Sequence, residues 1–202
     1  MSALSGVDIR RRLQEASLDQ RLVISPILEI DEQIRPDQAS VDLRLGFEFA
    51  FVSPSFFGVV DELSPKLSDP AAFSGLYKRQ YVPFGKSLSI HPHQFLLATT
   101  LEYLRLPPNL MAYVVGRSTW GRLGLIVATA IGIHPLFAGP LTLELRNLGE
   151  TPLEIHPGQA VAQLFFHTVS NDGGGQAPQQ SQYVGAANLL PRSLSSKTPP
   201  CQ

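Results

Sequence analysis

Short runs in which apolar and polar residues alternate are the main pattern along this chain. The alternation is clearest in Ser40–Leu45 and Leu141–Arg146, where every second residue is apolar. A period of two residues is that of a β-strand with one face buried. Other short runs, rich in β-branched and aromatic residues, predict five further strands: Arg21–Ile24, Ser87–Ile90, Phe95–Thr100, Leu110–Val115 and Ala160–His167.

Proline and glycine separate these runs, and the 202 residues include 17 Pro and 16 Gly. Many short strands with turn residues between them are typical of a sandwich, a jelly roll or a small barrel. The predicted fold class is therefore all-β, with one helix near the N-terminus and short helical turns.

That helix is predicted over residues 5–16. Ser5 is a suitable N-cap and Asp8 follows three residues later. Four apolar residues offer an approximate buried face: Val7, Ile9, Leu13 and Ala16. The basic run Arg10–Arg12 is interpreted as the solvated side of the helix.

The chain divides into one domain, residues 1–169, and a C-terminal tail, residues 170–202. Within the domain, residues 54–80 are rich in proline and serine, and we expect an irregular insertion there. The tail is rich in Gly, Gln, Ser and Pro, and we expect it to be flexible unless a ligand or a neighbouring subunit orders it.

Charge and cysteine content exclude several classes of function. Sixteen Lys+Arg against seventeen Asp+Glu argue against a protein that binds nucleic acid through bulk electrostatics. Cys201 is the single cysteine, and the five histidines have no zinc-site spacing, so neither a disulfide framework nor zinc is expected. No apolar run approaches the ~20 residues that span a bilayer. We expect no membrane association and a cytoplasmic location.

The densest candidate for chemistry is Gly116–Gly124, which reads GRSTWGRLG and follows an apolar strand. Glycines let a backbone approach a ligand, hydroxyl and backbone N–H groups bind phosphate oxygens, and Arg117 can bind phosphate with two donors. Twelve Arg against four Lys fit such discrete anion contacts. The pattern alone is equally compatible with a surface turn carrying two solvated arginines.

Glu144 lies in the alternating run Leu141–Arg146, on the face opposite the leucines. If the leucines face the core, the pattern alone favours an ordinary exposed carboxylate.

Three stretches together resemble the deoxycytidine triphosphate (dCTP) deaminase branch of the dUTPase-like superfamily. They are Ala39–Gly46 (ASVDLRLG), the run from His91 to Leu125 that contains GRS-x-x-x-RLGL, and the run from Gly139 to Leu164 that contains Glu144. The resemblance covers roughly residues 8–167. It implies a β-clip, or distorted jelly-roll barrel, that assembles as a homotrimer or a dimer of trimers with active sites between subunits.

The resemblance also implies a deoxycytidine nucleotide as substrate, with Mg²⁺ bound through its phosphates and no zinc. It makes Glu144, Ser118 and Arg122 the catalytic residues. Further substrate contacts are implied at the following positions: Arg117, Thr119, Gly121, Ala130, His134, Thr142, Leu143, Gln163, Gln182 and Tyr183.

Zinc-free deamination at C4 of cytosine needs one group that takes a proton from water and returns it to N3 and to the leaving ammonia. A carboxylate does this if partial burial tunes its pKa. Glu144 is the candidate on the matching strand, and the dUTPase branch typically lacks it, which favours deamination.

The segment after RLGL departs from the family pattern. It is one residue shorter, with Gly132 near the position of a family Arg and His134 at the position of an Asp that orients water in dUTPases. In the tail, Gln182-Tyr183 is followed by Ala186, so a Lys and a Gln of the family are missing. His134 can bond a sugar hydroxyl, or simply cap a turn before Pro135.

Three functions stay open from the sequence. The leading one is a deaminase that releases ammonia without matching pyrophosphate, because His134 replaces the Asp that diphosphatase chemistry uses. The others are a dUTPase-type diphosphatase and a diverged, non-catalytic nucleotide-binding protein. The residues do not decide between dCTP, dCMP and a modified cytosine nucleotide.

Overall fold

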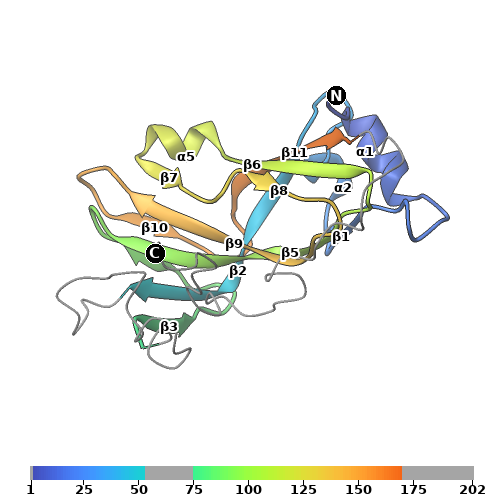
Figure 1. Cartoon of the computed structure of the whole chain (residues 1–202). Helices are drawn as coiled ribbons and strands as arrows, with labels where there is room; N and C mark the ends of the chain where they lie inside the picture. Colours follow the sequence, from blue (N-terminus) through green and yellow to red (C-terminus); the bar gives the residue numbers. More distant parts are fainter. Residues whose placement is uncertain (1, 53–74, 170–202) are drawn as a thin grey trace, which may run out of the picture.

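Antiparallel strands dominate the computed structural model, which describes residues 2–52 and 75–169. Its helices are α1 (Gly6–Leu13), α2 (Ile30–Gln33) and α5 (Ser118–Arg122). Its strands are β1 (Val23–Ser25), β2 (Val41–Val52), β3 (Tyr77–Tyr81), β4 (Leu88–Ile90), β5 (Phe95–Arg105), β6 (Leu110–Gly116), β7 (Leu125–Val127), β8 (Gly132–Ile133), β9 (Ala138–Asn147), β10 (Leu153–Ile155) and β11 (Ala160–Thr168). In Figure 1, α1 and α2 lie at one end of the molecule, and α5 with β7 lies toward the other.

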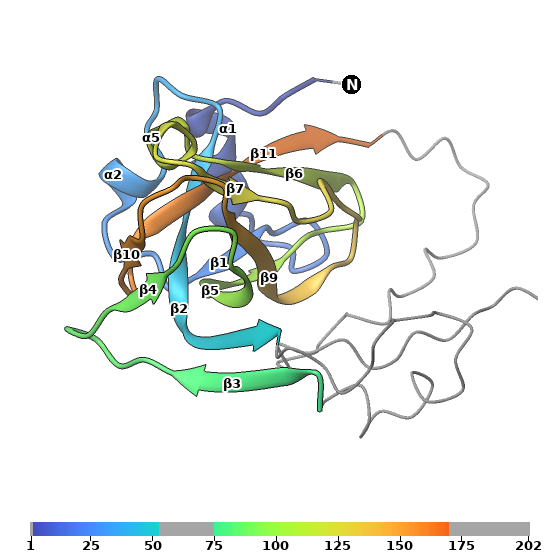
Figure 2. The ribbon, with the colours of Figure 1, turned by 90° about the vertical axis from the view of Figure 1, so that its left-hand side faces the viewer.

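The main sheet has the strand order β7-β9-β5-β2-β11-β6-β8, with β1 added to β5 and β3 added to β2. A second sheet pairs β10 with β4, and all these pairings are antiparallel. The register shifts in β2 between Leu45 and Phe49 and in β5 between Thr99 and Tyr103, and such irregularities bend strands. The sheet curls around one core, as the two perpendicular views show (Figures 1 and 2). The all-β prediction is confirmed.

The predicted alternation holds in β9. Leu141, Leu143 and Leu145 are buried in the core, while Thr142 and Glu144 on the other face are half-buried. Each of the seven predicted strands is present, several of them longer than expected. The expectation of an irregular insertion over 54–80 was wrong at its end, because residues 77–80 belong to β3, which pairs with β2. Residues 53–74 and the tail 170–202 lie outside the described residues.

Helix α1 begins as expected and ends three residues early. The Ser5 hydroxyl accepts from the backbone N–H of Asp8 at 3.2 Å, and the Asp8 carboxylate accepts from the backbone N–H of Ser5 at 3.4 Å. This reciprocal capping box fixes the helix start. Ile9 is fully buried and Leu13 packs against the core, four residues apart on one face. The prediction that Val7 and Ala16 share that face was wrong: Val7 points outward and Ala16 lies beyond the helix, and both are exposed.

The interpretation of Arg10–Arg12 as a purely solvated run was wrong for Arg10. Its Nε donates to the backbone oxygen of Ile34 at 2.8 Å, and its Nη1 lies 2.8 Å from the Asp31 carboxylate. These contacts tie α1 to α2. They occur because the carbonyls at the end of a helix lack helical partners and readily accept from a cation.

A buried polar bridge lies where β2 changes its pairing partner. Residues 41–44 of β2 pair with β11, and from Leu45 to Phe51 the strand pairs with β5. Glu102 of β5, which is fully buried, accepts from the backbone N–H of Arg44 at 2.9 Å and from Nε of the same residue at 2.6 Å. Gln33 donates to Glu102 at 3.0 Å and to the backbone oxygen of Asp42 at 3.0 Å. These side chains therefore satisfy backbone groups that strand pairing leaves open.

Burial raises the pKa of Glu102, and the donors of Arg44 oppose that rise. We expect Glu102→Gln to lower the free energy of unfolding by about 3 kcal/mol or more, because an amide N–H would face a donor and leave the Arg44 charge unpaired. Chemical denaturation measures this. The control is Asp31→Asn at the Arg10 pair, whose acidic side chain is 84% exposed, with an expected loss of about 1 kcal/mol or less. Similar losses in the two variants would contradict the role given to the bridge.

Candidate active site

The Gly-Arg-Ser loop forms a short helical turn at the end of β6. Arg117 is the N-cap of α5, and four further polar or small positions of the loop are exposed: Ser118, Thr119, Gly121 and Arg122. Trp120 anchors the turn, because its indole N–H donates to the backbone oxygen of Ala160 on β11 at 3.0 Å. The loop therefore offers its hydroxyl and guanidinium groups outward from a fixed base.

Gly124 ends this loop in a conformation that favours glycine. Its φ is +94°, and a Cβ there would lie 2.7 Å from the backbone nitrogen of Gly149. The backbone oxygen of Gly124 accepts from the N–H of Leu148 at 2.8 Å. The glycine of the RLGL motif is thus required by a close approach of two backbones, which returns the chain to β7 beside β9.

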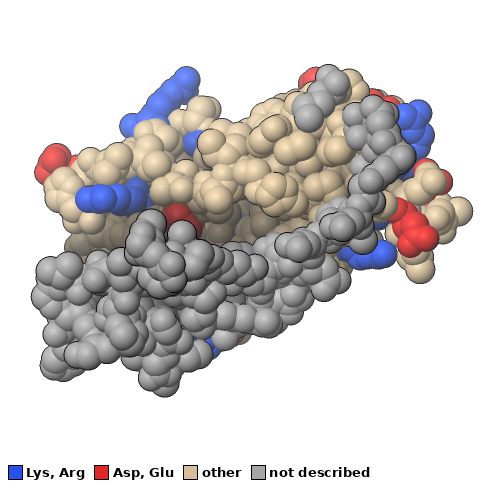
Figure 3. All heavy atoms as spheres, in the orientation of Figure 1, with Lys and Arg blue, Asp and Glu red and all other residues tan. Residues whose placement is uncertain are grey.

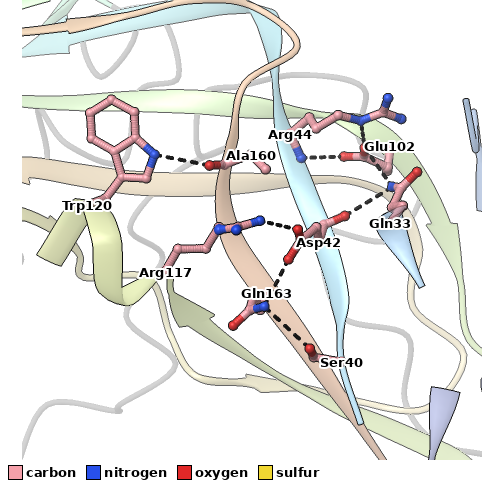
Figure 4. A network of polar contacts seen from close by, with 9 residues as sticks. All are labelled: Gln33, Ser40, Asp42, Arg44, Glu102, Arg117, Trp120, Ala160 and Gln163. Atoms are coloured by element: carbon pink, nitrogen blue, oxygen red, sulfur yellow. Dashed lines mark hydrogen bonds and ion pairs between the residues drawn. The ribbon is translucent and has the colours of Figure 1, made fainter. Parts of the chain in front are cut away.

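Arg117 and Gln163 meet on one carboxylate, that of Asp42 on β2 (Figure 4). Nη1 of Arg117 donates to Oδ2 of Asp42, and Nε2 of Gln163 donates to Oδ1 at 2.9 Å. Gln163 also contacts the Ser40 hydroxyl at 3.4 Å. The structure therefore brings together two predicted ligand-binding residues from α5 and β11 through a third residue.

A cavity of about 380 Å³ lies beside this cluster. Arg117, Asp42 and Arg44 contribute to its wall, and α2 with its flanking residues supplies Glu29, Glu32, Gln33 and Arg35. The remaining lining residues are Leu28, Gly158 and Ala160. Charged groups of both signs thus border a space next to the Gly-Arg-Ser loop, which suits an ionic ligand.

Glu144 occupies the middle of β9, with Leu97 of β5 opposite it. Its backbone N–H donates to the Thr129 hydroxyl at 2.7 Å, and its backbone oxygen accepts from the N–H of Ala128 at 2.7 Å. The side chain is half-buried, and this burial raises the pKa of the Glu144 carboxyl above its ordinary value. The pattern alone favoured an ordinary exposed carboxylate, and the structure gives a partly desolvated one.

The other predicted contact residues differ in their surroundings. Thr142 is half-buried opposite Thr99, Leu143 packs its side chain into the core, and Ala130 is exposed. Within the described residues, no hydrogen bond or ion pair joins the Glu144 side chain to Ser118 or Arg122. Gln182 and Tyr183 lie outside the described part of the chain.

His134 follows β8 and is exposed. Its backbone oxygen accepts from the N–H of Phe137 at 3.3 Å, so His134 opens a tight turn before Pro135. That turn agrees with the structural alternative for His134, and the exposed imidazole stays available to a ligand.

Asp42 is the site residue to which the sequence analysis gave no role. The alternation of Ser40–Leu45 places Ser40, Asp42 and Arg44 on one face, opposite Val41, Leu43 and Leu45. The sequence therefore did indicate that Asp42 lies on the polar face of a strand, beside one basic residue, and is available for a polar contact. The pairing with Arg117 spans 75 positions, and strand alternation carries no information on such contacts.

The described residues contain no group of three or more His, Cys, Asp and Glu side chains arranged to hold a metal ion. Among the described helices, none combines the length and apolar character needed to cross a bilayer. On the face shown in Figure 3, the described Lys and Arg side chains are scattered over the surface, and those at the right-hand end lie beside Asp and Glu side chains.

Fold and site together define a β-rich protein with an exposed Gly-Arg-Ser loop, whose Arg117 pairs with Asp42, and a partly desolvated carboxylate. The family model described as dCTP deaminase-like matches residues 3–169. The chain belongs to this family, which confirms the resemblance drawn from its motifs.

Curated relatives match most of the chain. It is 37% identical over 203 residues to a protein of Methanobrevibacter smithii named "dCTP deaminase, dUMP-forming", covering 98% of this chain and 96% of the relative. A "dCTP deaminase" of Natronomonas pharaonis is 39% identical over 164 residues, covering 81% and 78%. A protein of Dictyoglomus thermophilum, also named "dCTP deaminase, dUMP-forming", is 38% identical over 169 residues, covering 83% and 81%.

The fold is similar to the crystal structure of 2'-deoxycytidine 5'-triphosphate deaminase from Agrobacterium tumefaciens. The TM-score is 0.59 at 24% identity, and the match covers 81% of this chain and 46% of that one. The chain thus spans just under half of that structure's length, and the likeness supports the fold assignment.

The raised pKa of Glu144 makes the charged form costly in the folded state, so its contribution to stability is lost as pH rises through the folded-state pKa. We expect the free energy of unfolding of Glu144→Gln, relative to wild type, to increase between about pH 4 and about pH 7. Urea denaturation at both pH values measures it. The control, Thr142→Val on the same face, carries no titratable group and should differ from wild type equally at both pH values. A pH-independent difference for Glu144→Gln would contradict the desolvation.

Proposed function

We propose that this chain catalyses the hydrolytic deamination of dCTP to dUTP and ammonia. The observation that carries the proposal is the half-buried Glu144 on β9, with its raised pKa, in a chain of this family. A carboxyl poised above its ordinary pKa can both accept and return protons near neutral pH.

In the proposed reaction, Glu144 takes a proton from a water molecule whose oxygen adds to C4 of cytosine. Glu144 delivers that proton to N3, which leaves a hydroxyl and the amino group on C4. It then moves the proton of the new hydroxyl to the amino nitrogen, so that the C4–N bond breaks, ammonia leaves and the C4 carbonyl forms. Ser118 and Arg122, exposed on α5, would position the water and the pyrimidine. The product retains the carbonyl oxygen derived from water, so atoms and charges balance.

The phosphates would bind at Arg117, with the hydroxyl of Ser118 and Thr119 and the backbone through Gly121 as further donors. Gln163 would lie near the nucleotide, and Thr142, Leu143, Ala130 and His134 would surround base and sugar, with Gln182 and Tyr183 as tail contacts. Mg²⁺ would enter bound to the phosphates and supply charge neutralisation.

We also propose that the site is completed between subunits of a homotrimer or a dimer of trimers in the cytoplasm. Support comes from exposed apolar side chains on and around the Gly-Arg-Ser loop: Val115, Leu123, Ile126 and Ile131. Such side chains gather where another subunit covers them. An active monomer in sedimentation would contradict this arrangement.

A second candidate function is the formation of dUMP, which the names of six curated relatives favour, including those of Methanobrevibacter smithii and Dictyoglomus thermophilum. From dCTP this product requires the release of both ammonia and pyrophosphate. His134 argues that the chain stops at dUTP, since it stands where the dUTPase pattern has an Asp and an imidazole offers no carboxylate to hold the attacking water.

Ammonia and pyrophosphate should therefore be followed separately with Mg²⁺ and each of dCTP, dCMP, dUTP and 5-methyl-dCTP. We expect ammonia from dCTP, and a loss of roughly 10²-fold or more in Glu144→Gln, the usual effect of removing a general acid and base. Glu150→Gln, an exposed carboxylate six positions along, is the matched control. A Glu144→Gln variant with near-wild-type ammonia release would exclude the assignment, and nucleotide binding without any release would identify a non-catalytic homologue.

The substitution His134→Asp separates the two product outcomes. We expect wild type to release negligible pyrophosphate from dUTP, and the Asp variant to gain pyrophosphate release or bind the nucleotide more tightly, because a carboxylate can hold water or the sugar hydroxyl. The control is His156→Asp, at an exposed histidine that follows β10. Efficient cleavage of dUTP by wild type would favour dUMP formation and show that another carboxylate holds the water.

A further inference from the structure

We propose that Asp42 is a positioning residue for the phosphate end of the nucleotide, through its hold on Arg117 and Gln163. The inference rests on the proposed function and assigns a role to a residue outside the predicted set.

The first support is convergence. Each carboxylate oxygen of Asp42 accepts from a different element, Oδ2 from Arg117 at the start of α5 and Oδ1 from Gln163 on β11. The side chains of Arg117 and Asp42 are 32% and 20% exposed, so solvent screens this pair less than one on the open surface. One carboxylate thereby sets the direction of two ligand-binding groups.

The second support is that the backbone around Asp42 is fixed by hydrogen bonds from other elements (Figure 4). Gln33 donates to the backbone oxygen of Asp42 and to Glu102, and Glu102 accepts from the backbone N–H of Arg44, two residues further along β2. The strand is thus fixed at Asp42 and two residues beyond it. A fixed acceptor fixes the plane of the guanidinium that binds to it.

The third support is the geometry of the remaining donors. A guanidinium has five N–H groups in a rigid fork, and Asp42 engages Nη1. Among residues 2–52 and 75–169 no other hydrogen bond engages the remaining guanidinium donors of Arg117, which can therefore meet phosphate oxygens. Both Arg117 and Asp42 line the cavity of about 380 Å³. Holding an arginine in its binding orientation before the ligand arrives reduces the entropy lost on binding.

Calorimetric titration with dCTP and Mg²⁺ tests this, with ammonia release at saturating dCTP as a second readout. We expect Asp42→Asn to weaken binding about tenfold or more, the range for losing a charged hydrogen bond, while kcat changes by less than about threefold. Asp31→Asn is the matched control, since it also removes an Arg partner, at the exposed Arg10 pair, and it should leave binding unchanged.

A double-mutant cycle with Arg117→Lys separates positioning from simple stabilisation. If Asp42 acts in part through Arg117, adding Asp42→Asn to Arg117→Lys should cost clearly less affinity than it does in wild type, the remainder reflecting the contact with Gln163. Additive losses, or unchanged affinity in Asp42→Asn, would overturn the proposal. Asp42→Glu keeps the charge but shifts the carboxylate by one methylene. Should the Asn variant not fold, weakened binding in Asp42→Glu supports positioning, and full affinity overturns it.

Inorganic triphosphate with Mg²⁺ provides a probe that does not depend on the base. If wild type neither binds nor deaminates dCTP, the proposed function fails. The Asp42 inference is then judged on triphosphate alone, where Asp42→Asn must again lose about tenfold in affinity. Absence of triphosphate binding in wild type would overturn the inference as well.

Discussion

The Glu102 bridge is the interaction on which the arrangement of the site depends. The pairing partner of β2 changes from β11 to β5 between Arg44 and Leu45. At this point the carboxylate of Glu102 and the amide of Gln33 form hydrogen bonds with backbone groups of β2 that a neighbouring strand would otherwise pair. A sheet that changes partners leaves such groups open, and leaving them buried and unpaired costs about 1–3 kcal/mol each. The bridge removes that cost and holds β2 where Asp42 meets Arg117.

Glu102 and Glu144 show two uses of burial for the same functional group. Glu102 is fully enclosed and surrounded by donors, so its charge serves the fold. Glu144 is half-buried, and desolvation alone is the cause of its raised pKa. A carboxylate without matching donors is costly to the folded state. The neighbours Leu143 and Leu145 are fully buried, so β9 is well packed and Glu144 is a local exception. Such local costs in an otherwise consistent structure are typical of functional positions, which agrees with the proposed role of Glu144 in proton transfer.

Strand alternation made much of the fold predictable, whereas contacts between distant segments were not. The pattern in Leu141–Arg146 placed the leucines in the core because the period of a strand is local. The same rule marked Asp42 as polar but could not bring it to Arg117, a contact across 75 positions. Arg10 was misassigned for a related reason, since its partners are the Asp31 carboxylate and the backbone oxygens of Ile30 and Ile34, which lie 20 to 24 positions further along the chain. β3 was missed because YKRQY has no apolar alternation, and its exposed edge position needs none.

The pairing of Arg117 with Asp42 would also explain how a chain of net charge −1 selects the polyphosphate of the proposed substrate. An isolated arginine attracts any anion, whereas one already bonded to a carboxylate has much of its charge compensated. A ligand with one negative charge then gains little, because the carboxylate nearby repels it. A polyphosphate gains more, since several oxygens meet the remaining donors and its own cation offsets the repulsion. Selectivity at the proposed site would therefore depend on the placement of donors and acceptors rather than on a positive surface.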